Sequence, residues 1–194
     1  MKKVWVLSLL FLLVWGGIFP QGSTTIDWGM AVLKYNGFDY DSHSSHMPIP
    51  METGDEYYLY VTSDSPGHAY IIKEYPDRTL SILFGGPITA GNALFIMDGN
   101  DDFIVPAGSG IIRIHVVVTS TPRPVLQQNQ GARLSGAQRT AVIDEIQAIG
   151  RSVSSIAEAP ELPVRMGAGT RGGGMTVYRY GGQNTYVREV VIRF

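Results

Sequence analysis

The stretch 52–120 most constrains what this chain can fold into, because apolar and polar residues alternate there over several short segments. Its clearest segment, 57–62, is rich in tyrosine and β-branched residues, as strands commonly are. Its last segment, 111–119, places four apolar side chains on one face and Arg113 and His115 on the other. Several short strands at this spacing, separated by turn residues, predict a mainly β, antiparallel, β-sandwich-like (immunoglobulin-like) domain.

The sandwich-like domain is expected to span residues 24–122, with a first strand at 26–35 and a polar, proline-containing loop at 39–50. Strand 57–62 is expected to form a hairpin with strand 69–75. The sequence Gly85-Gly86-Pro87 is expected to end the strand that begins at Leu80. The expected core consists of Trp28, Leu59, Val61, Ile72, Leu83, Phe84, Ile114, Val116 and Val118.

The C-terminal part predicts a linker at 123–134 and one α-helix at 135–159. Apolar residues recur there at helical spacing, at Val142, Ile146, Ile149, Val153 and Ile156. We expect this stripe to pack on the β domain; the alternative is a helix that stays free until a partner binds it. Residues 160–175, which are rich in glycine and proline, predict a flexible segment, and residues 176–194 predict a final β-hairpin.

Composition excludes several kinds of chemistry. The 194 residues contain no cysteine, which excludes disulfides, thiolate metal sites and thiol catalysis. The charge is uneven: residues 24–110 carry −9 and residues 111–194 carry +5. The arginines are scattered rather than clustered, so we interpret the two halves as neighbours that partly neutralise each other. The alternative is an arginine surface for an anionic partner. We expect no nucleic-acid partner, and the oligomeric state stays open.

Residues 1–22 have the features of a secretory signal peptide. Lys2 and Lys3 precede a nearly unbroken apolar run, and Gly16, Gly17 and Pro20 then interrupt it. The run is about sixteen residues long, which is short of the roughly 20 residues of a membrane-spanning helix. We expect an exported protein that is periplasmic, secreted or on the outer surface, without a stable membrane span once the leader is removed; the alternative is an uncleaved anchor.

The order of motifs between residues 54 and 122 resembles the bacterial family called "domain of unknown function 4384". The shared motifs are Gly54-Asp55 before an alternating strand, the turn at Pro76-Asp77, Leu83-Phe84, Ala90-Gly91 and a closing hydrophobic strand. The chain departs from the family pattern at Arg78 and Gly85, where glycine and proline are usual. The resemblance implies a small β-sandwich-like module, often found on exported proteins, and brings no activity or catalytic residues with it.

Two motifs resemble the sequence patterns of functional sites but lack features that those sites need. Residues 167–172 spell G-x-G-x-x-G, but a β-type segment follows them where a dinucleotide fingerprint needs a helix. Residues 98–102 look like the start of a calcium loop, but Phe103 and Ser109 stand where the EF-hand needs glycine and glutamate. We interpret them as a flexible loop and an acidic turn, and we expect no cofactor.

The sequence favours a non-enzymatic binding or structural module of the bacterial cell envelope, with a protein or an envelope glycan as partner. Exposed tyrosines such as Tyr58 and Tyr60 would provide contacts. The alternative is a metal-dependent hydrolase, because Asp41, His43 and His46 lie in one polar loop and are possible zinc ligands. His68 and His115 are expected to be surface histidines.

Removal of the leader is directly testable. Protein isolated from the cell envelope should have an intact mass that lacks the leader, with cleavage between about 17 and 24. A mass that still includes the apolar residues 4–15 would show instead that the leader is retained as an anchor.

Overall fold

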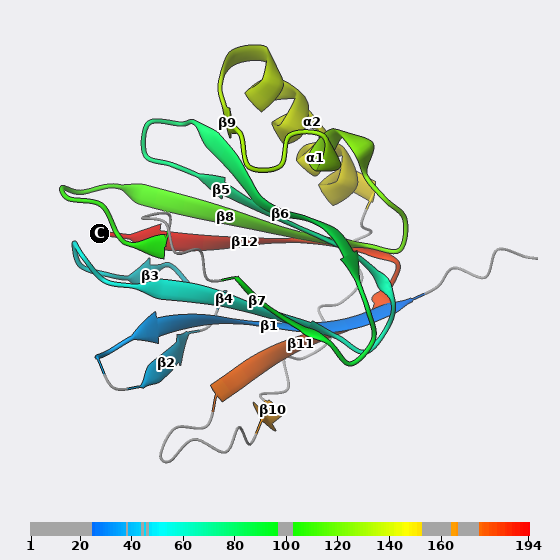
Figure 1. Ribbon diagram of the computed structural model, residues 1–194, viewed down its shortest axis with the longest axis horizontal. Coiled ribbons are helices and arrows are strands. Elements are labelled where there is room, and N and C mark those ends of the chain that lie inside the picture. Colours follow the sequence, from blue (N-terminus) through cyan, green and yellow to red (C-terminus); the bar gives the residue numbers. More distant parts are fainter. Residues whose placement is uncertain are drawn as a thin grey trace, which may run out of the picture.

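The computed structural model confirms a mainly β, sandwich-like fold made of two sheets that face each other (Figure 1). It describes residues 25–37, 39–43, 45, 47–96, 103–152, 164–166 and 175–194. Within these ranges, no helix combines the length and the apolar composition that crossing a membrane requires.

The first sheet is built around β1 (Ile26–Tyr35), which forms where the first strand was expected. β1 pairs antiparallel with β4 (Tyr57–Ser63), and β4 pairs with β7 (Ala93–Ile96) at the edge. The other side of β1 is shared, because β11 (Met175–Gln183) pairs with its first half and β2 (Tyr40–His43) with its second half. β10 (Val164–Met166) extends the sheet beyond β11.

The second sheet is built around β8 (Ile111–Thr119), which lies between β12 (Thr185–Arg193) and β5 (Gly67–Glu74). β6 (Leu80–Ile88) pairs with β5, and β9 (Arg133–Leu134) pairs with the start of β6. These pairs are antiparallel. β3 (Ile49–Pro50) adds a parallel edge beside the end of β12.

The space between the sheets holds the main hydrophobic core. Of the nine side chains expected in a core, six are buried in this one: Trp28, Leu59, Val61, Ile114, Val116 and Val118. Leu83 and Phe84 are only partly buried and pack against it, and Ile72 belongs to a second cluster outside the sandwich. Trp28 stacks on Tyr180 with ring centroids 4.7 Å apart, and its ring also lies near Tyr186 of the opposite sheet.

The second cluster lies under the helices. α1 (Pro124–Gln127) and α2 (Gly136–Ser152) cover the outer face of the second sheet (Figure 1). Val142, Ile146 and Ile149 are buried against Tyr70, Ile72, Leu80, Ile82 and Val117 of that sheet. The prediction that the helical stripe docks on the β domain is therefore confirmed. The rest of the expected helix, from 153 to 159, lies outside the described residues.

Both expected hairpins are wrong in their pairing, although their strands are at the expected places. β4 belongs to the first sheet and β5 to the second, and β11 and β12 are separated in the same way. The turn after β4 is tied to β1, the neighbouring strand of the same sheet, since the Ser63 hydroxyl donates to the carbonyl oxygen of Asp27 at 3.2 Å and the Asp64 N–H donates to the same oxygen at 2.8 Å. Alternation identifies a strand, but a short turn can lead either to the same sheet or to the opposite one.

Three segments that were expected to interrupt the regular secondary structure contain strands or a helix instead. The expected loop at 39–50 contains β2 and β3, and the expected linker at 123–134 contains α1 and β9, because Leu126 and Leu134 are buried. β6 runs on through Gly85, Gly86 and Pro87. A Cβ at Gly85 would lie 3.3 Å from the carbonyl oxygen of Leu126, so this glycine lets α1 approach the sheet closely.

Several expected features lie outside the described residues. These are the leader at 1–22, the turn at 98–102, the glycine motif at 167–172 and most of the segment at 160–175.

Val116→Asp should abolish cooperative folding. The change loses about 1.5–3 kcal/mol of apolar burial and places a carboxylate in the core, while total stabilities are only about 5–15 kcal/mol. Met47→Asp, at an exposed site, should alter the free energy of unfolding by no more than about 0.5 kcal/mol. Thermal and urea unfolding followed by circular dichroism would test both; a Val116→Asp variant with the melting curve of the wild type would remove β8 from the core.

Candidate functional site

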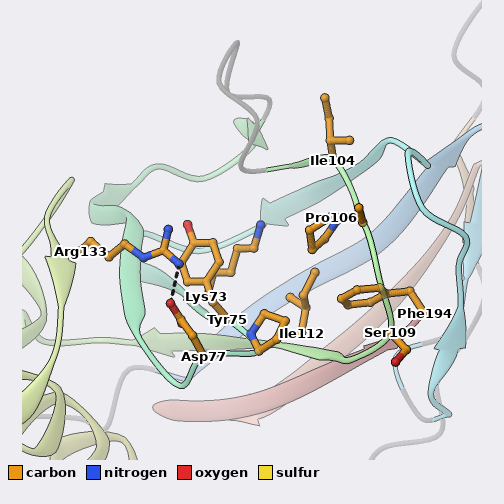
Figure 2. Close-up of a pocket in the computed structure, with 11 residues that line it drawn as sticks. Lys73, Tyr75, Asp77, Ile104, Pro106, Ser109, Ile112, Arg133 and Phe194 are labelled. Atoms are coloured by element: carbon orange, nitrogen blue, oxygen red, sulfur yellow. Dashed lines mark hydrogen bonds and ion pairs between the residues drawn. The ribbon is translucent and has the colours of Figure 1, made fainter.

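A pocket of about 610 Å³ opens at the end of the sandwich where β5 turns into β6 (Figure 2). We call it the tyrosine pocket. Pockets of about 300–1,000 Å³ are the usual size for small-molecule sites. Its walls combine apolar and charged side chains, and they include Lys73, Tyr75, Asp77, Ile104, Pro106, Ile112, Arg133 and Phe194.

The turn between β5 and β6 positions the polar side of this pocket. Asp77 Oδ1 accepts hydrogen bonds from the Thr79 N–H at 2.9 Å and from the Thr79 hydroxyl at 2.6 Å. These bonds hold the pKa of the Asp77 carboxyl below its usual value. Arg133 on β9 pairs with Asp77 at 3.2 Å, and its guanidinium lies 3.9 Å from the centroid of the Tyr75 ring (Figure 2). The turn, the ring and the guanidinium are thus fixed relative to one another.

Lys73 brings an ammonium group to the pocket from inside the fold. Its side chain is only 1% exposed, which is rare for lysine. Its Nζ lies 4.7 Å from the ring centroid of Tyr75, 5.5 Å from that of Tyr57 and 6.0 Å from that of Phe103. Aromatic faces stabilise a cation at these distances, by roughly 0.5–2 kcal/mol each.

A second pocket, of about 420 Å³, lies next to the first, and the two share Tyr75, Pro76 and Ser109 in their walls. We call it the arginine pocket, because Arg78, Arg113 and Arg139 line it. These arginines come from the β5–β6 turn, from β8 and from α2. Glu74 at the end of β5 is the acidic residue in its wall.

Glu74 is the centre of a charged cluster behind the arginine pocket. Its Oε1 accepts a hydrogen bond from Arg139 Nη2 at 2.7 Å, and its Oε2 lies 4.0 Å from His115 Nε2. His115 Nδ1 in turn lies 3.7 Å from Glu189 Oε2, and Arg113 Nε lies 3.8 Å from Glu189 Oε1. His115 was expected at the surface but is buried, because it lies on the central strand of its sheet. Burial lowers the pKa of His115 despite the two carboxylates.

Ion pairs between the two halves of the chain support the neighbour interpretation of the uneven charge. Arg133 pairs with Asp77, Arg139 with Glu74 and Arg179 with Asp64. Each pair joins an arginine of the basic half to an acid of the acidic half.

The metal-ligand candidates are only partly placed. Asp41 and His43 lie two residues apart on β2, and Asp41 Oδ2 is 3.4 Å from the Asn36 amide nitrogen. His46 lies outside the described residues. No group of three or more His, Cys, Asp or Glu side chains that could hold a metal occurs in the described part of the chain. His68, which was also expected at the surface, is half-buried on β5.

The two tyrosines expected as exposed contacts are not equally accessible. Tyr60 is buried, with its ring 5.4 Å from that of Phe95, so that expectation is wrong for Tyr60. Tyr58 is half-buried and donates a hydrogen bond to Glu56 at 2.9 Å, which raises the pKa of Tyr58 to about 12.

The tyrosine and arginine pockets were not predicted from the sequence. Their residues come from β5, the β5–β6 turn, the segment 104–110, β8, β9, α2 and the final residue, and no local motif joins these segments. The one available signal was Lys73 at an alternating position of a strand in which its neighbours Ile71 and Ile72 are apolar.

His115 should make the protein less stable in mild acid. Because its pKa in the folded state lies below the usual 6.5, the unfolded state binds the proton first as the pH falls. The stability that comes from keeping His115 neutral in the folded state is present above pH 6.5, and it is lost as the pH falls from 6.5 through the lower pKa of the folded state. His115→Gln should therefore show a smaller decrease in Tm between about pH 7.5 and 5.5 than the wild type. Equal decreases in the two proteins would refute this role.

Comparison with known proteins does not extend these observations: no family model, no curated protein and no solved structure matches the chain. The resemblance to the domain of unknown function 4384 accordingly stays a prediction.

Proposed function

We propose that this chain is an exported, non-enzymatic binding module of the bacterial cell envelope and that the tyrosine pocket is its ligand site. The observation that carries the proposal is a pocket of about 610 Å³ that combines apolar walls with two cationic side chains. Concave sites of this size and mixed lining are the usual form of small-ligand sites. The proposal of export rests on the signal-like residues 1–22.

The lining favours a ligand group with a flat or apolar body and an anionic substituent. Apolar contact area comes from Ile104, Pro106, Ile112 and Phe194. The ring of Tyr75 also lines the pocket, and the guanidinium of Arg133 lies over it. Lys73 and Arg133 outnumber Asp77, so the formal charge of the lining is positive. An anionic substituent would complement this charge.

The proposal for a non-enzymatic role rests on how the polar groups are engaged. Asp77 is bound by Thr79 and Arg133, and Arg133 is stacked on Tyr75. These contacts hold the groups still, but they do not join a nucleophile to a base, which covalent catalysis would need. The pocket is therefore better suited to recognition than to chemistry.

Site-specific photo-crosslinking in the native cell envelope would test this function. A crosslinking amino acid at Ile104, which lines the pocket and is 37% exposed, should capture one defined envelope component, either a glycan or a protein. The matched control is the same amino acid at Met47, which is exposed and is not part of the pocket lining.

The crosslink should also disappear when the pocket is altered without unfolding the protein. Arg133→Ala removes the guanidinium from Tyr75, and its exposed ion pair with Asp77 contributes at most about 1 kcal/mol to stability. Identical products from Ile104 and Met47, or an Ile104 product that persists in Arg133→Ala, would overturn the proposal. One equivalent of zinc in the purified protein, lost in His43→Ala and His46→Ala, would favour the metal-dependent hydrolase instead.

A further inference from the structure

We infer that the arginine pocket is an oxyanion site that binds a phosphate group. This inference goes beyond the proposed function and does not depend on the tyrosine pocket binding anything. Its lining contains Arg78, Arg113 and Arg139 against the single acid Glu74, which leaves a formal charge of +2. A phosphate group carries about 1.5 to 2 negative charges at neutral pH, and arginine is well suited to bind it through paired N–H donors.

The three arginines differ in how strongly the protein already holds them. Arg139 is fixed, because its Nε donates to the Arg78 carbonyl oxygen at 2.6 Å and its Nη2 pairs with Glu74 at 2.7 Å. Arg113 has a long contact of 3.8 Å with Glu189, and its side chain is 41% exposed. Arg78 forms no ion pair with any side chain in the described part of the chain. One guanidinium is therefore held in position, and two have capacity left for a ligand.

The backbone of Arg78 provides a second, independent observation. Its φ angle is 64°. Among the residues that the structure describes, Arg78 is the only one other than glycine with a positive φ. This left-handed region is unfavourable for a side chain with a Cβ and is usually filled by glycine. The bond from Arg139 to the Arg78 carbonyl helps to hold that conformation. A residue that costs stability at this position, and whose side chain lines a pocket, is more readily explained by binding than by folding.

A simpler interpretation is that these arginines are ordinary surface charges balanced by nearby acids. Glu74 and Glu189 do balance Arg139 and Arg113 in part. Surface balance alone explains neither the excess charge around a concavity of about 420 Å³ nor an arginine at a position whose backbone favours glycine. The two interpretations predict different phosphate affinities for the Arg78→Gly variant.

Arg78→Gly should stabilise the fold and weaken phosphate binding at the same time. Glycine relieves the left-handed backbone, so Tm should rise by about 2–4 °C. Loss of a charge-assisted hydrogen bond should weaken the affinity for inorganic phosphate by about tenfold. Binding to the purified protein at low ionic strength would be followed by NMR, using the amide signals of Ser109 and Gly110 in the pocket wall.

A control variant separates a built site from general electrostatic attraction. Arg151→Gln removes the same charge from an exposed position in the last turn of α2. It should keep the phosphate affinity within about twofold of the wild type, and acetate, with its single charge, should bind more weakly than phosphate in both proteins. Wild-type phosphate affinity in Arg78→Gly, or an equal loss in Arg151→Gln, would overturn the inference.

Discussion

The two faces of strand β8 pack against different surroundings, and the rest of the structure depends on both sets of contacts. Its inner face, from Ile112 to Val118, fills the space between the sheets and makes the sandwich possible. On its outer face, Val117 is covered by the helical layer, whereas His115 lies near Glu74 and Glu189, and Arg113 lies near Glu189. Along this one strand the outer surface thus changes from apolar to charged, and the change marks where α2 stops covering the sheet and the pockets begin.

Glu74 connects that charged end to the helix. A carboxylate with 12% of its side-chain surface exposed would be costly without partners, and here Arg139 of α2 provides one. The same guanidinium binds the backbone of the β5–β6 turn, which carries residues of both pockets. The helix is therefore more than a cover over apolar residues, because it also fixes the position of the segment from which the ligand sites are built.

Most of the strands could be predicted from alternation alone, and so could the docking of α2, because its apolar stripe is periodic. The partners of the strands could not. In a sandwich, both sides of a central strand can be buried, so that Tyr60 and His115 look like surface residues by alternation and yet lie inside. Likewise, glycine and proline in 85–87 predict the end of a strand, although β9 pairs only with the start of β6, and these residues are compatible with continued pairing to β5 on one side.

The candidate sites were harder to predict than the fold, and for a physical reason. Lys73, Arg133 and Phe194 are far apart in sequence and meet only because β5 and β12 end, and β9 begins, on the same side of the sandwich. In the sequence, none of these residues belongs to a local motif that indicates a binding site. Asp41 and His43 are close in sequence and were considered as metal ligands, but the described residues contain no group of three or more side chains that could hold a metal.

The separation of β11 and β12 into opposite sheets determines when the chain can fold. β11 completes the pairing of β1 at the other end of the sequence, and β12 lies between β8 and β3. Contacts between such distant segments must be formed against a loop-closure cost that rises with their separation, and a high share of them makes folding slow. An emerging chain therefore has neither sheet complete until its last residues have been synthesised. For an exported protein, as we propose this one to be, that delay would keep the chain unfolded while it is being synthesised.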